Sequence, residues 1–246
     1  MSEQGTGEYI DPMLRRLIDQ VLAHVPSQCA VCRAWPSRPL CEACVSRFAQ
    51  PRARCQRCAL PVPAGVAQCG ACLKDPPPLD ACLAAVTYAY PWSDCISDFK
   101  FHGHTGWAAT FATLLRSTPW VEPALEQADW VLPLPLSDAR LKERGFNQAL
   151  LLARHLAPGK ARADLLLRIR STAAQSELKR AERLRNVKGA FALEPALAHL
   201  LRDRRVVLVD DVMTSGASLY AAASALRQAQ MAHITAIVLA RTNAPE

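Results

Sequence analysis

The chain has 246 residues, half of them hydrophobic, and a formal net charge of +7. This length predicts one full domain of about 150 residues with a smaller appendage, and the positive charge favours anionic partners, either nucleic acid or a substrate rich in phosphate. No segment approaches the ~20 apolar residues of a membrane-spanning helix and no signal peptide is recognisable, so we expect a cytoplasmic protein without membrane insertion, whose thiols stay reduced.

Residues 1–25 are predicted to form a polar tail followed by one amphipathic helix. Asp11 is suited to the N-cap of this helix and Pro12 to its first turn. We expect its apolar stripe to pack on the rest of the protein, with a partner-binding helix as the alternative. The stripe has helical spacing and consists of Met13, Leu14, Leu17, Ile18, Val21 and Leu22.

Residues 26–80 are rich in cysteine and proline and lack apolar periodicity. Such a segment is too poor in apolar surface to fold around a core of its own and needs cross-links. Its cysteines form four Cys-x-x-Cys pairs, and two such pairs complete the tetrahedral Cys₄ shell that structural zinc prefers. The predicted metal ligands are Cys29, Cys32, Cys41, Cys44, Cys55, Cys58, Cys69 and Cys72.

The simplest arrangement of these pairs is a double zinc ribbon, in which the first two pairs bind one ion and the last two bind another. An interleaved arrangement, a single zinc ion and an iron-containing cluster stay open. Disulfides or redox-active pairs fit less well in a chain without an export signal. Asp75 and the prolines at 76–78 then close the segment as a stiff linker.

Residues 81–246 show short apolar runs separated by helical patterns, which predicts an α/β domain with a mainly parallel sheet. In such a sheet, ligands bind beyond the carboxyl ends of the strands. Cys82 and Cys95 stand in apolar surroundings and are expected to be small buried side chains. We expect strands near 83–90, 129–134, 165–169, 206–210 and 234–240, and helices near 105–116, 146–157, 175–186 and 217–229.

One strand-to-helix junction carries the clearest chemical signal. The apolar run 206–209 leads into a turn of small and hydroxyl-bearing residues, after which a helix begins near Ala217. Backbone N–H groups at such a junction converge on a phosphate, assisted by the positive end of the helix. Gly216 lets the main chain approach the ligand without a Cβ atom in the way. The predicted phosphate loop consists of Val212, Met213, Thr214, Ser215, Gly216, Ala217 and Ser218.

Two adjacent acids, Asp210 and Asp211, stand between the strand and this loop. Their carboxylates are suited to accept hydrogen bonds from two ribose hydroxyls and to help hold Mg²⁺, which usually takes few carboxylates and keeps several waters. The structural alternative is that they cap the next helix. That alternative leaves unexplained why an apolar strand runs straight into two acids and a Thr-Ser-Gly turn, so we expect a sugar-phosphate ligand.

The string 206–218 resembles the signature of type I phosphoribosyltransferases, and with the cysteine pairs the chain is similar, over about residues 26–242, to the ComF family. The resemblance implies a type I phosphoribosyltransferase fold preceded by a zinc ribbon, and it assigns the stretch 172–186 to a mobile loop. A leaving pyrophosphate needs positive charge nearby, for which Arg170 is a further candidate. The implied site residues are Asp210, Asp211 and Arg144 as catalytic groups, and Lys100, Leu134, Pro135 and Arg140 on the pyrophosphate side.

The resemblance implies a protein that binds phosphoribosyl pyrophosphate with Mg²⁺, transfers the phosphoribosyl group to a nitrogen acceptor, and takes part in DNA uptake during natural transformation. No motif identifies the acceptor. The competing hypothesis is a non-catalytic sensor or scaffold that binds single-stranded DNA or proteins of the competence machinery, which the net charge and the zinc ribbon favour. The intact acids Asp210 and Asp211 speak against a third hypothesis, a structural adaptor that has lost ligand binding.

Overall fold

The computed structural model of the chain describes residues 27–170, 187 and 189–243. The predicted helix in residues 1–25, the predicted helix near 175–186 and the family-like stretch 172–186 lie outside these residues. Contacts between Cα atoms divide the chain into two compact units, residues 1–44 and residues 45–246. The two groups of cysteine pairs therefore fall into different units.

The first unit holds the first two cysteine pairs. A short antiparallel bridge joins Ser27 and Ser37, whose backbone N–H groups each donate to the other's carbonyl at 2.7 Å. The bridge closes a turn in which the N–H of Arg33 donates to the carbonyl of Cys29 at 2.9 Å. Helix α2 (Glu42–Phe48) begins in this unit with its buried residue Cys44. The backbone bonds of residues 27–44 thus fold the two pairs toward one another.

A four-stranded parallel sheet forms the centre of the second unit, with the strand order β1, β6, β5, β2. Of the two central strands, β6 is buried along almost its whole length and β5 along most of it, as expected for parallel strands that are covered on both faces. The predicted α/β fold with a mainly parallel sheet is confirmed. The strands are β1 (Ala81–Thr87), β2 (Trp130–Pro133), β5 (Arg205–Met213) and β6 (His233–Arg241).

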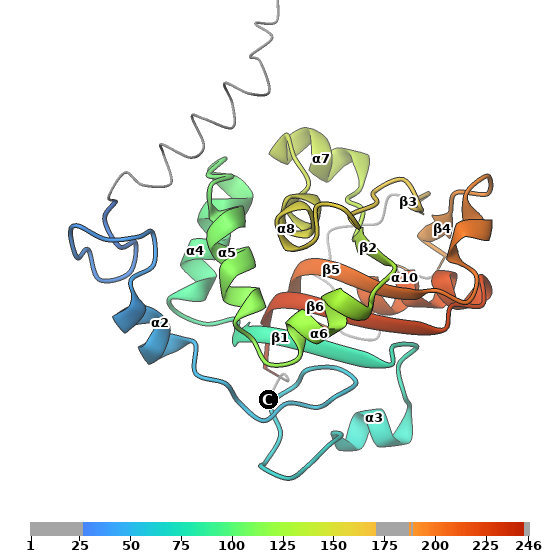
Figure 1. Cartoon of the computed structure of the whole chain (residues 1–246), viewed down its shortest axis with the longest axis horizontal. Coiled ribbons are helices and arrows are strands. Elements are labelled where there is room, and N and C mark those ends of the chain that lie inside the picture. Colours follow the sequence, from blue (N-terminus) through green and yellow to red (C-terminus); the bar gives the residue numbers. More distant parts are fainter. Residues whose placement is uncertain (1–26, 171–186, 188, 244–246) are drawn as a thin grey trace, which may run out of the picture. The chain divides into compact units, whose positions relative to one another are not determined.

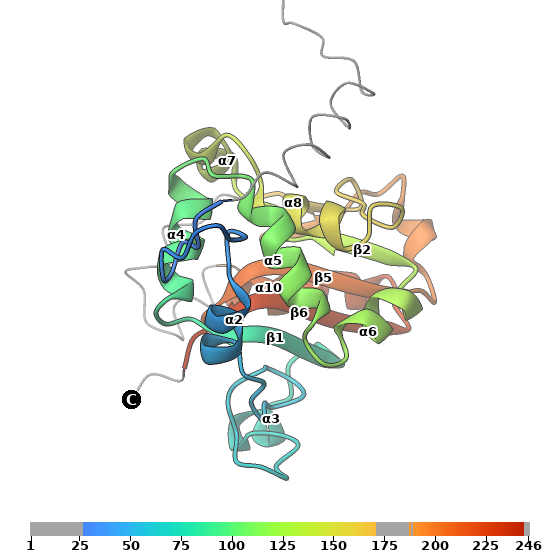
Figure 2. The same cartoon turned by 60° about the vertical axis from the view of Figure 1, so that its left-hand side comes forward.

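Helices cover both faces of this sheet. Figures 1 and 2 show α5, α6 and α8 on one face and α10 on the other. None of the helices within the described residues has both the length and the apolar character needed to cross a membrane. The helices of this unit are α3 (Gly70–Lys74), α4 (Trp92–Phe101), α5 (Trp107–Arg116), α6 (Val121–Gln127), α7 (Asp138–Arg144), α8 (Gln148–Leu156), the 3₁₀ helix η2 (Ala198–Leu201) and α10 (Ala217–Gln228).

The strand expected near 165–169 exists but does not join the parallel sheet. It is β3 (Leu166–Arg168), and it pairs antiparallel with β4 (Phe191–Leu193) in a separate two-stranded sheet. Only the first residue of β3 is buried, whereas a strand inside the parallel sheet would be buried on both faces. The pair β3 and β4 therefore forms a small sheet of its own and does not extend the main one.

The last two cysteine pairs pack with the α/β unit. Cys55 and Cys58 belong to the same buried cluster as Leu79 and the sheet residues. The segment predicted to be a linker is also fixed, because the guanidinium of Arg227 donates to the carbonyl of Pro78 at 3.2 Å and pairs with the carboxylate of Asp80. The predicted domain boundaries, 26–80 and 81–246, stay predictions. The division into two compact units lies between residues 44 and 45.

Candidate functional site

The carboxyl ends of four parallel strands meet at one edge of the sheet, and the predicted site residues follow these ends. β5 carries Asp210 and Asp211 near its end and continues into the predicted phosphate loop. The segment after β1 leads into α4, which bears Lys100, and the segment after β2 leads into α7, which bears Arg140 and Arg144. Residues more than 100 positions apart in the sequence are thus brought to one place.

Lys100 and Asp211 form a largely buried ion pair at this edge. The Nζ atom of Lys100 lies 2.9 Å from Oδ1 of Asp211, and the two side chains are 15% and 8% exposed. The backbone N–H of Asp211 also donates to Oδ1 of Asp210 at 2.9 Å. The two acids are therefore held side by side, with a cation from another helix already beside one of them.

The carboxyl group of Asp210 has a strongly shifted acidity. Burial, and then the negative charge of Asp211, raise the pKa of Asp210 to about 7, although the charges of Lys100 and Arg140 oppose this shift. The raised pKa means that the nearby cations do not fully offset the effects of burial and of the charge of Asp211 on Asp210. Such shifts are concentrated at functional sites, and an added cation would restore the ionised form.

Arg144 stands at the end of α7 with an unpaired donor. Its guanidinium carbon lies 5.0 Å from the centre of the Phe101 ring, and its Nε atom is buried without a hydrogen-bond partner among the described residues. Burial lowers the pKa of Arg144, while the charges of Asp211 and Asp210 act against this shift. Buried donors are nearly always bonded, so this Nε–H is suited to an anionic ligand.

Other residues predicted for the pyrophosphate side take different positions. Arg140 is close enough to Asp210 for its charge to lower the pKa of that acid. Leu134 is buried, with only 6% of its surface exposed, so its side chain is not available to a ligand. Its N–H and carbonyl are already bonded within the protein. Pro135 is partly exposed in the same segment.

Arg168 on β3 is a cation near this site that the motifs did not reveal. Burial and the charge of Arg140 lower the pKa of Arg168, and the charge of Asp210 opposes the shift. Arg170, the cation predicted in this segment from the sequence, is exposed. Alternation along a strand places residues two apart on the same side, and this was the available signal for considering Arg168 as well.

The predicted phosphate loop turns sharply between β5 and α10. Gly216 has a φ of +82°, and a Cβ atom there would lie 2.6 Å from side-chain atoms of both Met213 and Tyr220. Met213 is buried and anchors the loop in the core. The hollow over the loop measures about 30 Å³ and is lined by Asp210, Val212, Met213, Thr214, Gly216, Ala217, Ser218 and Leu219.

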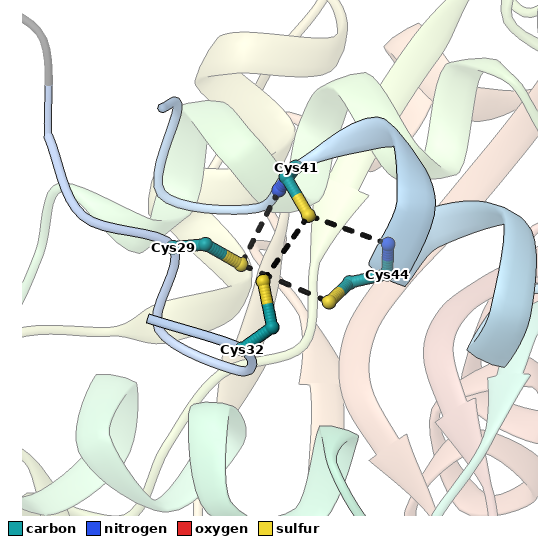
Figure 3. Close-up of side chains that lie close together, drawn as sticks. All are labelled: Cys29, Cys32, Cys41 and Cys44. Carbon is teal, nitrogen blue, oxygen red and sulfur yellow. Dashed lines mark hydrogen bonds between the residues drawn. The ribbon is translucent and has the colours of Figure 1, made fainter. Parts of the chain in front are cut away.

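The first cysteine cluster gathers four sulfur atoms from consecutive pairs, Cys29 with Cys32 and Cys41 with Cys44 (Figure 3). All four lie within 4.8 Å of one another, and the separations of 3.9 Å and 3.5 Å are near the ~3.8 Å expected for a tetrahedral zinc with 2.3 Å bonds. Burial alone would raise the pKa of Cys29, but hydrogen bonds from the backbone of Cys32 and Cys41 lower it to about 6.

The second cluster repeats this arrangement with Cys55, Cys58, Cys69 and Cys72, again within 4.8 Å. The sulfur atoms of Cys58 and Cys69 are 3.7 Å apart, and the N–H of Cys69 donates to the sulfur of Cys55 at 3.3 Å. Consecutive pairs are therefore combined, as in the simpler of the two predicted arrangements, and the interleaved one is not found. Both clusters fit structural zinc.

Comparison with known proteins agrees with this architecture. The phosphoribosyl transferase domain family matches residues 141–246, which include the end of α7, the strands β3 to β6 and the predicted phosphate loop. The "DNA utilization protein YhgH" of Salmonella typhimurium is 33% identical over 232 residues, covering 89% of this chain and 98% of that protein.

Two relatives named for competence are also similar. "Competence protein F" of Haemophilus influenzae is 34% identical over 181 residues, covering 70% of this chain and 78% of that protein. "Competence protein ComFC" of Bacillus subtilis is 31% identical over 158 residues, covering 63% and 62%. With a phosphoribosyltransferase domain, paired cysteine clusters and relatives that cover most of its length, the chain belongs to the ComF family.

Proposed function

We propose that the site at the carboxyl edge of the sheet binds phosphoribosyl pyrophosphate with Mg²⁺ and transfers the phosphoribosyl group to a nitrogen acceptor. The observation that carries this proposal is the gathering of Lys100, Arg140 and Arg144 around Asp210 and Asp211, directly before a tight, small-residue turn into a helix. Cations, adjacent acids and a phosphate loop are the three elements that a magnesium-bound sugar pyrophosphate requires.

Each group has a defined task in this proposal. The loop 212–218 binds the 5′-phosphate through backbone N–H groups and the hydroxyls of Thr214, Ser215 and Ser218. Asp210 and Asp211 accept hydrogen bonds from the ribose hydroxyls. The buried Nε–H of Arg144, together with the charge of Arg140, stabilises the departing pyrophosphate.

The transfer step exchanges one bond for another at C1 of the ribose. The lone pair of the acceptor nitrogen forms the new bond to C1, the bond from C1 to the pyrophosphate oxygen breaks, and pyrophosphate leaves with the electron pair while the acceptor loses a proton. Bound Mg²⁺ would neutralise charge on the pyrophosphate, with Asp210 and Asp211 as the residues that hold it. The protein's own contribution is to position the reactants and to supply fixed positive charge.

Replacing Arg144 by Gln is expected to raise the Kd for phosphoribosyl pyrophosphate with Mg²⁺ at least ~tenfold. A hydrogen bond to a charged group contributes about 1.5–3 kcal/mol, and 1.4 kcal/mol corresponds to a factor of ten. Isothermal titration calorimetry measures this change. Lys142→Gln is the matched control, because Lys142 belongs to the same helix and is exposed; a less than twofold change is expected there. Equal Kd values for both variants would show that Arg144 does not bind phosphoribosyl pyrophosphate.

A second role is proposed in DNA uptake during natural transformation. It rests on the names of relatives, a "DNA utilization protein" and two "Competence" proteins, and it is consistent with the net charge of +7. Single-stranded DNA or proteins that process it are the proposed partners, and the cytoplasm, where thiols stay reduced, is the proposed compartment. The chain acts there as a transferase if it passes the phosphoribosyl group to a nitrogen acceptor, and as a ligand-sensing scaffold if it binds phosphoribosyl pyrophosphate without transfer.

Direct binding of single-stranded DNA is expected to weaken steeply with salt. Each phosphate contact contributes about −0.7 to the slope of log K against log salt concentration for a single strand, so four contacts give a slope near −3. Fluorescence anisotropy with a labelled oligonucleotide between 50 and 300 mM NaCl measures it. A flat dependence would exclude binding through phosphates and would leave protein partners as the route to the competence role.

A further inference from the structure

Arg241, the last residue of β6, is a buried cation whose acceptors are four backbone carbonyls and the hydroxyl of Thr242. Its side chain donates to the carbonyls of Cys58 at 2.8 Å and of Met213 at 3.0 Å, and also to those of Thr214 and Thr242. Among the residues that the structure describes, no carboxylate forms an ion pair with Arg241. The residue itself is only 3% exposed.

These carbonyls belong to two separate features of the molecule. Cys58 is one of the four cysteines of the second cluster, whereas Met213 and Thr214 belong to the predicted phosphate loop. A guanidinium group is planar and presents its donors in a fixed fork, so it fixes the distance between the carbonyls that it binds. A buried charge is tolerated only when its donors are bonded. Because the acceptors of Arg241 come from both the loop and the cluster, its hydrogen bonds hold the two together.

A second set of contacts follows the same route. The sulfur of Cys82 donates to the sulfur of Met213 at 3.6 Å. The N–H of Cys82 donates to the carbonyl of Gln56, inside the first turn of the second cluster, at 2.7 Å. The loop is therefore connected to the second cysteine cluster in two ways, through the side chain of Arg241 and through Cys82 of β1.

We propose that Arg241 is a positioning residue, which holds the phosphate loop in its binding conformation by fixing it to the backbone of the second cysteine cluster. Arg241 does not contact the ligand in this proposal. Its effect on affinity rests on the proposed binding of phosphoribosyl pyrophosphate, whereas its effect on the conformation of the loop is independent of that function. Neither residue spacing nor any motif connects Cys58 with Met213, so the link exists only in the folded chain.

The first test is hydrogen–deuterium exchange of the ligand-free, zinc-loaded protein. In Arg241→Met, the amides of residues 213–218 and of the turn 55–58 are expected to exchange at least ~tenfold faster, while those of α8 keep their rate. Arg227→Met is the matched control, because Arg227 also binds two backbone carbonyls, at residues 78 and 231, beside its ion pair with Asp80, and none of these contacts involves the loop. Unchanged exchange in the loop would overturn the proposal, and so would equal acceleration in all segments.

The second test is calorimetric titration with phosphoribosyl pyrophosphate and Mg²⁺. Arg241→Met is expected to raise the Kd about tenfold or more, and Arg241→Lys, which keeps the charge and some of the donors, to restore part of the loss. Arg227→Met should bind like the native protein even if its melting temperature falls equally. If the Arg241 variants bind normally, the positioning role is refuted. If the native chain binds nothing, the proposed function fails while the exchange experiment still decides about Arg241.

Discussion

The variant Asp210→Asn/Asp211→Asn is expected to show no measurable binding of phosphoribosyl pyrophosphate with Mg²⁺ while keeping the native fold. Two adjacent carboxylates would be lost as acceptors for the ribose hydroxyls and as the acidic groups that hold the metal. The change at Asp211 also removes the negative charge that pairs with the largely buried Nζ of Lys100 at 2.9 Å. Isothermal titration calorimetry measures binding, and circular dichroism verifies the fold.

The matched control for this variant is Asp75→Asn/Asp203→Asn, which removes the same charge from two exposed positions and should bind like the native protein. The same pair of variants separates the two proposed functions. Binding of single-stranded DNA should survive the loss of Asp210 and Asp211, because carboxylates do not attract phosphates. Retained affinity for phosphoribosyl pyrophosphate would refute the assignment of the loop, and a joint loss of both ligands would mean that one site serves them.

The single variant Asp210→Asn should stabilise the ligand-free protein while it weakens the proposed ligand binding. The pKa of Asp210 is raised to about 7 in the folded protein from an ordinary value of 3.8. The folded state then holds a proton that the unfolded chain releases, so stability falls as the pH rises from about 4 to 7. Asparagine does not carry this cost, and we expect a melting temperature about 3 °C higher at pH 8, with the difference vanishing near pH 4.

Much of this site was predictable because its parts are continuous in the sequence. The apolar strand, the acids Asp210 and Asp211 and the turn at Gly216 follow one another within a dozen residues, and each has a local physical reason. The ion pair between Lys100 and Asp211 is different, since it depends on how α4 packs beside β5. Only the family resemblance led to Lys100, and nothing in the sequence led to Arg241.

Most of the elements that were not predicted from the sequence are short, although the ten-residue helix α4 is among them. Helix α7 has seven residues, too few for apolar periodicity, although Ser137 at its N-cap and Gly145 at its C-cap were readable signals. Strand β4 has three residues and pairs antiparallel with β3, a partnership that no pattern of alternation could reveal at that length. Long, buried elements such as β5, β6 and α10 were predicted to within a few residues because packing and periodicity agree there.

The division of the cysteine-rich segment could not be foreseen either. Four pairs with equal internal spacing predict two equivalent metal sites, and the geometry of both clusters is indeed alike. What distinguishes them is the surrounding core. Cys55, Cys58 and Cys72 are buried together with Leu79 and the residues of the sheet, whereas the first cluster belongs to the unit of residues 1–44. The two clusters should therefore differ in their importance for stability.

Cys69→Ser is expected to lower the melting temperature of the unit of residues 45–246 by about 10 °C or more. Structural zinc contributes an apparent ~10–16 kcal/mol in zinc-finger peptides, so even a loss of about 3–5 kcal/mol would have this effect in a unit of this size. Cys41→Ser should change that melting temperature by less than about 2 °C, because Cys41 lies in the other unit. Differential scanning calorimetry measures both variants.

The metal content of the same samples shows whether a loss of stability accompanies the loss of a zinc ion. The native chain is expected to contain two zinc ions and each variant one, as measured by inductively coupled plasma mass spectrometry. If Cys41→Ser lowers the melting temperature of residues 45–246 as much as Cys69→Ser does, the two units do not fold independently. If Cys69→Ser loses its zinc without any loss of stability, the second cluster does not stabilise the α/β unit. The predicted phosphate loop is then held in place by the protein core alone.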